Sequence, residues 1–143
     1  MIDRSENITL ITMRNIPNQM ELIAQVFRCV SDKGINVDMI TQTQAYKNKV
    51  DLSFTVEDDD LPAVIEALGV FKKDGIVIDI LSNCSKIVYI DEKMCVTPGY
   101  GAKIFTLLAN KGIEALIITT SVTDISVLLE GDDLDPAIEA LTE

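Results

Sequence analysis

The sequence predicts an α+β protein built from two tandem copies of one small module, with the element order strand, helix, strand, strand, helix, strand. Three observations lead to this prediction. Short matches from the first half of the 143-residue chain recur in the same order in its second half. Apolar residues in each copy follow first the two-residue period of strands and then the spacing of helices. Glycine, proline and cap residues separate these segments.

The internal repeat is the firmest of these observations. Residues 24–27 (AQVF) return as 102–105 (AKIF), and residues 65–68 (IEAL) return unchanged at 138–141. The first motif recurs 78 residues later and the second recurs 73 residues later, so the offset falls by five. The second copy therefore lacks five residues between the two matches. We place this difference in a hairpin loop, because loops tolerate changes of length.

The first copy begins with an alternating strand over residues 8–13. A helix follows, with apolar side chains at Leu22, Ile23, Val26, Phe27 and Val30. Asn18 and Glu21 form a capping-box-like pair at its start, and Gly34 is placed to stop it. The remaining elements are two strands at 35–44 and 50–56, a second helix opened by Asp59 or Asp60 with Pro62 in its first turn, and a strand at 75–81.

The second copy repeats this order but stops early. We expect a strand at 86–91, a helix from Thr97-Pro98 to Gly112, a hairpin of residues 114–121 and 123–129, and a last helix capped by Asp133. No final strand follows, so the second module lacks its last strand and presents an edge that another chain could cover. The predicted modules are residues 1–82 and 83–143.

This element order predicts a four-stranded antiparallel sheet in each module, with both helices on one face. The other face of such a sheet also needs cover. We therefore expect the two copies to pack together and the chain to form a dimer.

Composition excludes several classes of function. The net charge of −11 argues against a nucleic-acid partner, because phosphate binding needs a basic face. The chain has no histidine, which removes the usual proton shuttle and the commonest metal ligand, so catalysis is not expected and no cofactor is predicted. The three cysteines, Cys29, Cys84 and Cys95, show neither a CxxC pair nor the even number typical of a disulfide framework, so we expect reduced thiols. Without a membrane span or signal peptide, we predict a cytoplasmic protein.

A set of motifs carries a family resemblance. They are residues 33–40 (KGINVDMI) followed by Gln42, residues 50–56 (VDLSFTV), Met94 with Thr97-Pro98-Gly99, residues 118–121 (ITTS), and residues 125–134, which begin ISVL and end DDL. In this order they resemble the tandem ACT-domain regulatory region of aspartate kinase, over nearly the whole chain. The ACT module is ferredoxin-like. The resemblance includes no kinase domain, which implies a free-standing regulatory protein or an excised fragment.

The resemblance implies allosteric control of aspartate kinase, the first step towards lysine, threonine and methionine, with lysine or threonine bound between modules. It places ligand-binding residues on the first loop (Ile16, Pro17, Asn18, Gln19, Met20, Glu21), on the second strand (Asn36, Val37, Asp38, Gln42), and in the second copy (Met94, Thr97, Pro98, Gly99, Thr119, Thr120, Ser121). It also implies a homodimer and an association with a kinase catalytic subunit.

Elementary chemistry gives these positions a role of their own. A helix N-terminus offers free N–H groups to a carboxylate, and Asp38 could accept an ammonium group. Asn18 and Glu21 stand where the family has an acid and a glycine, and Leu116 stands where it often has an acid. A complete site would therefore draw on both copies or on two chains.

Structural roles compete with these functional ones. Asn18 and Glu21 fit a capping box, residues 119–121 fit hydrogen bonding at an interface, and the acidic clusters fit helix caps. The alternative function is a dimerisation or docking module that binds no small ligand. A phosphatase using Arg14 would require a glycine-rich anion cradle, which residues 15–21 do not provide.

Overall fold

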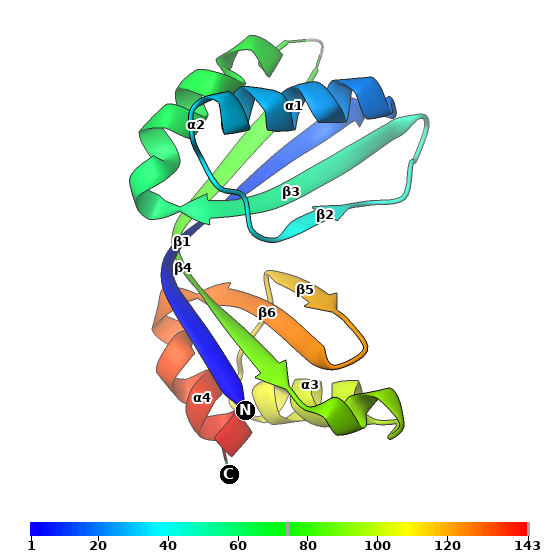
Figure 1. Cartoon of the computed structure of the whole chain (residues 1–143), viewed down its shortest axis with the longest axis vertical. Helices are drawn as coiled ribbons and strands as arrows, with labels where there is room; N and C mark the ends of the chain where they lie inside the picture. Colours follow the sequence, from blue (N-terminus) through cyan, green and yellow to red (C-terminus); the bar gives the residue numbers. More distant parts are fainter. Residues whose placement is uncertain (74, 143) are drawn as a thin grey trace. The chain divides into compact units, whose positions relative to one another are not determined.

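The computed structural model describes residues 1–73 and 75–142 (Figure 1). Six strands and four helices make up its regular elements. They are β1 (Ile2–Pro17), α1 (Met20–Asp32), β2 (Ile40–Gln42), β3 (Lys49–Glu57), α2 (Leu61–Leu68), β4 (Val77–Ile90), α3 (Tyr100–Asn110), β5 (Ile117–Thr120), β6 (Asp124–Glu130) and α4 (Leu134–Thr142). Hydrogen bonds join the strands in the order β2-β3-β1-β4-β6-β5. This antiparallel α+β architecture confirms the predicted fold class.

The chain forms two compact units, which we call module 1 and module 2. Module 1 consists of Ile8–Ser82, and module 2 consists of Met1–Asn7 together with Asn83–Glu143. The first seven residues thus belong with the second copy, although they precede the first copy in the sequence.

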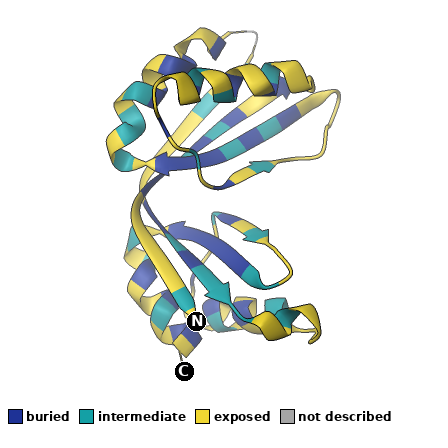
Figure 2. Ribbon diagram, in the orientation of Figure 1, coloured by how far each residue is buried: buried dark blue, intermediate teal, exposed yellow. Residues whose placement is uncertain are grey.

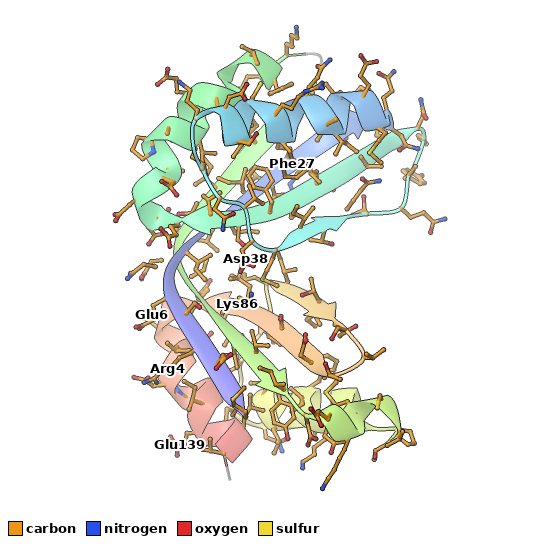
Figure 3. All side chains as sticks on the ribbon, viewed as in Figure 1. Arg4, Glu6, Phe27, Asp38, Lys86 and Glu139 are labelled. Carbon is orange, nitrogen blue, oxygen red and sulfur yellow. The ribbon has the colours of Figure 1, made fainter. Side chains whose placement is uncertain are left out.

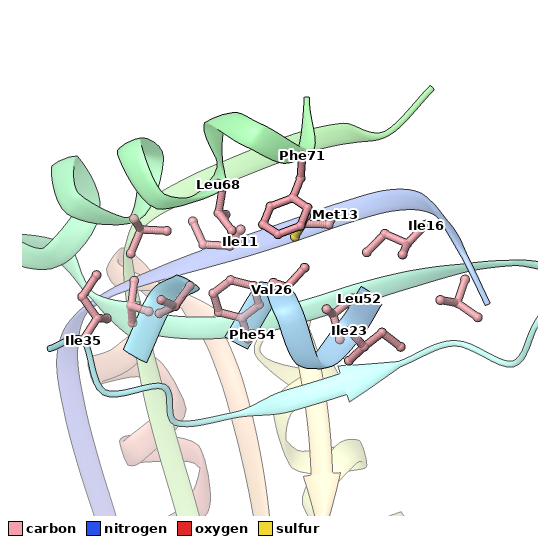
Figure 4. Close-up of a cluster of buried hydrophobic side chains, with 14 residues drawn as sticks. Ile11, Met13, Ile16, Ile23, Val26, Ile35, Leu52, Phe54, Leu68 and Phe71 are labelled. Carbon is pink, nitrogen blue, oxygen red and sulfur yellow. The ribbon is translucent and has the colours of Figure 1, made fainter. Parts of the chain in front are cut away.

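Module 1 buries its core between the sheet and helices α1 and α2. From Lys49 to Phe54 the burial along β3 alternates with the two-residue period of a strand, because alternate side chains face the helices (Figure 2). Phe54 is fully buried, and its ring meets that of Phe27 edge to face at 5.3 Å between centroids. Figure 4 shows this cluster. Its fully buried members include Ile11, Met13, Ile16, Val26, Val30, Phe54 and Val64.

Module 2 has the same plan, with one strand supplied from the start of the chain. β4 pairs with β6, and β6 pairs with β5. On the other side of β4, the Met1 nitrogen donates to the Ile90 carbonyl at 3.0 Å, and the Ile90 N–H donates to the Met1 carbonyl at 2.8 Å. Ile2 packs against the core of this module. The chain's own first residues therefore take the place beside β4 that the sequence left open to another chain.

β4 is one continuous strand where the sequence suggested two. The prediction placed one strand at 75–81 and another at 86–91, and the residues between them include the polar Ser82, Asn83 and Ser85. In the structure, Cys84 lies opposite Glu130 and Ser85 lies opposite Leu129. Asn83 has a left-handed φ of 59°, but pairing with β6 from Cys84 onward continues the strand, and this tertiary contact overrides the local signal.

The hairpins of the two modules differ in length as predicted. Ile40 pairs with Phe54 in module 1, whereas Ile118 pairs with Val127 in module 2, so the first hairpin is longer by five residues. It ends in a two-residue turn at Lys47 and Asn48, whose φ angles of 51° and 62° are left-handed. Such a turn suits the right-handed twist of the flanking strands.

The glycines predicted to stop α1 and α3 lie where expected, but the side chains predicted to cap the starts of α1 and α2 form no capping hydrogen bond. Gly34 has a φ of 74° and Gly112 a φ of 71°, and each closes its helix as expected. The predicted capping box is wrong, because Gln19 is the N-cap of α1 and no side chain caps it. Asp60 is the N-cap of α2, again without a side-chain hydrogen bond, since residues Asp58–Asp60 form a 3₁₀ turn instead.

One ion pair recurs in both modules. Lys33 Nζ lies 2.7 Å from Glu66 Oε1 in module 1, and Lys111 Nζ lies 3.5 Å from Glu139 Oε1 in module 2. These residues occupy equivalent positions of the repeat. Lys33 lowers the pKa of the Glu66 carboxyl by hydrogen bonding and by its charge. Because both pairs are exposed, we assign them a role in helix orientation rather than a large share of stability.

The core predicts a large difference between two phenylalanine substitutions. Phe54→Ala should cost about 3–5 kcal/mol, because the side chain is fully buried and leaves a cavity. Phe105→Ala should cost about 1 kcal/mol or less, because Phe105 is 38% exposed. Urea denaturation of both variants measures the difference. Equal losses of unfolding free energy would contradict the assignment of Phe54 to the core.

Candidate functional site

The first candidate corner is the loop between β1 and α1, which holds Ile16 to Glu21. The side chain of Ile16 is buried in the core of module 1. The Asn18 N–H donates to the carbonyl of Asn48 in the hairpin turn at 3.0 Å, and the Gln19 N–H donates to the Pro17 carbonyl at 2.7 Å. The longer hairpin of module 1 therefore uses one of the loop's backbone donors.

The first two residues of α1 carry backbone N–H groups that cannot bond within the helix. Leu22 and Ile23 both donate to the Gln19 carbonyl. Met20 and Glu21 precede them as the first residues of the helix, where N–H groups have no partner within the helix. Glu21 places a carboxylate in this first turn, where the positive end of the helix dipole stabilises it. The negative charge of Glu21 repels a second anion at this position.

The second candidate group lies on the run that leads into β2. The Asp38 N–H donates to the Thr55 carbonyl at 3.0 Å, and the Thr55 N–H in turn donates to the Met39 carbonyl. The Met39 N–H also reaches the Thr55 hydroxyl at 3.0 Å. The backbone around Asp38 is thus fixed beside β3, with its side chain exposed. Asn36 is also exposed, and Val37 packs against the core.

The two groups lie at opposite ends of module 1. Pro17 pairs with Lys49 at the start of β3, whereas Asp38 bonds to Thr55, six residues further along that strand. At about 3.3 Å per residue this separation is about 20 Å, much longer than a free amino acid. Gln42 lies between them, opposite Leu52. The structure therefore does not bring the first loop and Asp38 together within one module.

The corner of module 2 has a different construction. Residues Glu92–Cys95 form a 3₁₀ turn, and Gly99 is the N-cap of α3 with a φ of 98°. This left-handed value strains any residue with a side chain, which explains a glycine here. The helix begins at Tyr100, not at the predicted Thr97-Pro98, and both of these residues are exposed. Met94 packs against the module core.

An aspartate–tyrosine pair closes this corner, and the sequence analysis did not identify it. Asp91 Oδ1 accepts the Lys93 N–H at 2.9 Å, and Asp91 Oδ2 accepts the Tyr100 hydroxyl at 3.0 Å. The Tyr100 ring also lies 6.3 Å from that of Tyr89. The bond from Lys93, followed by that from Tyr100, lowers the pKa of Asp91, and the bond to Asp91 raises the pKa of Tyr100. An aspartate at the end of a strand, before a turn, was the available signal.

The hydroxyl cluster of residues 119–121 is divided between strand and turn. Thr119 is half-buried opposite Ser126, and Thr120 is exposed. The Ser121 hydroxyl donates to Asp124 Oδ2 at 2.8 Å within the hairpin turn. Since the Asp91 N–H donates to the Thr123 carbonyl, this turn and the Asp91–Tyr100 pair lie at the same end of module 2.

Metal and membrane roles find no support in the described part of the chain. No group of three or more Cys, Asp or Glu residues there is arranged to hold a metal ion. None of the described helices combines the length and the apolar character needed to cross a membrane.

Comparison with known proteins identifies the modules. Residues 11–70 and residues 79–143 each match a model of the ACT domain. The chain therefore belongs to the ACT-domain family and carries two such domains. The two modules together are similar to the regulatory region of aspartate kinase, as the sequence motifs predicted.

Three relatives define this similarity. The aspartokinase of Mycolicibacterium smegmatis is 33% identical over 146 residues, which cover 99% of this chain and 34% of the relative. The ligand-free regulatory subunit of aspartate kinase from Thermus thermophilus is 27% identical, with a TM-score of 0.88 over 99% of this chain and 94% of its own. A structure of aspartokinase alpha and beta subunits is 31% identical, with a TM-score of 0.87 over 98% and 93% of the two chains. The chain spans about a third of the length of the curated relatives it matches.

The Asp91–Tyr100 pair gives a prediction with a defined sign. Tyr100→Phe should raise the pKa of Asp91 towards its ordinary value, because one of two hydrogen bonds to the carboxylate is lost. Any stability that the pair contributes is present above the ordinary pKa of aspartate and is lost as the pH falls through the lowered value. Carboxyl-carbon NMR titration of Asp91 measures the change. The same titration of Tyr46→Phe, which removes an exposed tyrosine hydroxyl at the other hairpin, is the control.

Proposed function

We propose that this chain is a regulatory amino-acid-binding protein that controls an aspartate kinase. The observation that carries the proposal is the similarity to an aspartate kinase regulatory subunit over nearly the full length of both chains. The chain itself has a non-catalytic role in this proposal, in the cytoplasm. Its macromolecular partner is an aspartate kinase catalytic domain.

The proposed ligand is lysine or threonine. Its carboxylate would meet the free N–H groups at a helix start, and its ammonium would meet Asp38. Because about 20 Å separates these groups within module 1, one ligand needs the loop of one module and the acid of another. The site would therefore form between ACT modules.

A homodimer follows from the same requirement. β2 and β5 are the edge strands of the hydrogen-bonded order, and each is short, with three and four residues. An edge strand presents unpaired N–H and C=O groups that a second chain can pair with. Pairing along such an edge would place ACT modules of two chains side by side.

The second candidate function is a dimerisation or docking module without a small ligand. Two observations favour it: Glu21 puts a negative charge at the start of α1, and the Asn18 N–H is already bonded within the protein. Both reduce what the first loop can offer to a carboxylate.

A thermal-shift panel of amino acids separates the two functions. Lysine or threonine at about 100 times its dissociation constant should stabilise the folded chain by about 2.7 kcal/mol, because it binds only the folded state. Glycine serves as the control ligand, since it shares the backbone groups and lacks the side chain. If no amino acid at millimolar concentration raises the melting temperature, the docking function stands in place of ligand binding.

Substitution of Asp38 tests the ammonium partner. Asp38→Ala should abolish the shift with lysine or threonine, because the ligand's ammonium loses its acceptor. The control is Asp32→Ala at the exposed C-terminal end of α1, which should leave the shift intact. A shift that survives in Asp38→Ala would exclude this residue from the site.

A further inference from the structure

Module 1 has a groove beside its first helix, which we call the α1 groove. It lies between α1 and the segment that follows α2, which begins with the 3₁₀ turn η2 (Gly69–Phe71). Its volume is about 410 Å³, within the range usual for ligand sites. Five of its lining residues come from α1 and three from the segment after α2, so module 1 alone forms this groove.

One wall is a stripe of α1 next to the face that the sheet covers. Its residues are three or four positions apart and so lie on one side of the helix: Leu22, Gln25, Cys29 and Asp32. Phe27, labelled in Figure 3, lies on another side, because its ring packs against Phe54 of β3. Leu22 and Cys29 are half-buried and Gln25 is exposed, so this wall passes from an apolar base to a polar rim.

Hydrogen bonds hold the other wall in shape. The Lys72 N–H donates to the Gly69 carbonyl at 3.3 Å, and the Lys73 N–H donates to the Phe71 carbonyl at 2.9 Å. Phe71 is 6% exposed and belongs to the core cluster in Figure 4, so it anchors this wall to the core. Val70 before it is 64% exposed and lines the groove. A ligand that covers Val70 removes apolar surface from water, which favours binding.

Two cations lie on opposite walls of the groove. Arg28 belongs to α1 and Lys73 to the segment after α2, and both are exposed. Among the described residues neither forms an ion pair, although the chain has 23 acidic residues and 12 basic ones. Arg14 and Lys33 of the same module each have a carboxylate partner. Asp32 is the one acid in the lining, so two positive charges and one negative charge leave the groove a single positive charge.

An organic monoanion with an apolar body matches this lining. Its body would cover Val70 and Leu22, and its carboxylate would meet the two cations, of which Arg28 offers a planar fork suited to both oxygens. Gln25 adds an amide donor at the same rim. A purely polar anion lacks the body that covers the apolar wall, and a neutral apolar molecule leaves both cations unpaired.

We infer that the α1 groove binds a small organic monoanion of the alkyl- or aryl-carboxylate class. Arg28 and Lys73 hold the carboxylate from opposite walls, and the apolar body lies against Val70 and Leu22. This inference does not depend on the proposed amino-acid site, because it uses none of that site's residues and requires no ammonium group on the ligand.

Cys29 provides a reporter of binding that the chain already carries. Its thiol lines the groove and is half-buried, whereas Cys95 is exposed in module 2. The probe is phenylacetate, and the control is phenylacetamide, which is neutral and has nearly the same shape. We expect the probe to slow alkylation of Cys29 by iodoacetamide several-fold and saturably, and to leave Cys95 unaffected, with both rates measured by mass spectrometry. Methyl NMR of Val70 follows the same binding without the thiol.

Three results would overturn the inference. Equal effects of the acid and the amide on Cys29 and on the Val70 methyl signals would exclude a role for the charge. Equal slowing of Cys29 and Cys95 would show that the effect is not local to the groove. Unchanged Val70 signals with phenylacetate at millimolar concentration would exclude binding of this ligand class.

Matched variants make the test specific to the two cations. Arg28→Gln and Lys73→Gln should each weaken phenylacetate binding several-fold. Lys103→Gln removes the same charge from an exposed position of α3 in module 2 and should leave the affinity unchanged. Asp38→Ala should also leave it unchanged, which separates the groove from the proposed amino-acid site. If both groove variants bind phenylacetate as well as the unmodified chain does, these cations do not hold the carboxylate and the inference fails.

Discussion

Antiparallel pairing of β1 with β4 is the interaction on which both modules depend. Its register is visible in the reciprocal bonds between Met1 and Ile90, and in the contact of the Thr9 and Ser82 hydroxyls at 3.0 Å. Each module needs a fourth strand beside its first one. Module 1 takes it from the residues that follow its second helix, and module 2 takes it from the beginning of the chain. Pairing partners that are far apart in sequence thus complete both sheets.

Duplication preserved the framework and allowed the corners to diverge. Both modules keep the helix-stopping glycines and the ion pair between their helices. In module 1, the loop between β1 and α1 bonds to the turn of a longer hairpin, and Glu21 follows it in the first turn of the helix. In module 2, a hydrogen bond between Tyr100 and Asp91 joins the start of α3 to the end of β4. Both modules have a sheet edge and a helix start at the same places, because the strands and helices that form the core end there. The side chains placed on them are free to change, because they lie outside that core.

Much of the architecture was predictable because it depends on local periodicity. The alternation in β1 and β3, the helical spacing in α1 and the five-residue difference between hairpins are all legible in the sequence. The capping box was not, because Asn18 bonds to the hairpin through its backbone and the helix begins one residue later than that motif needs. The distance between the first loop and Asp38 depends on strand register, which one sequence does not reveal.

The sequence by itself determined the repeat, the order of the elements and the apolar face of α1, since these depend on side-chain period and on turn chemistry. Only the tertiary structure decided that β4 is one strand, that residues 1–7 complete module 2, and that Asp91 meets Tyr100. The reason is the same in each case: these features depend on contacts between segments distant in the chain, which local patterns do not specify.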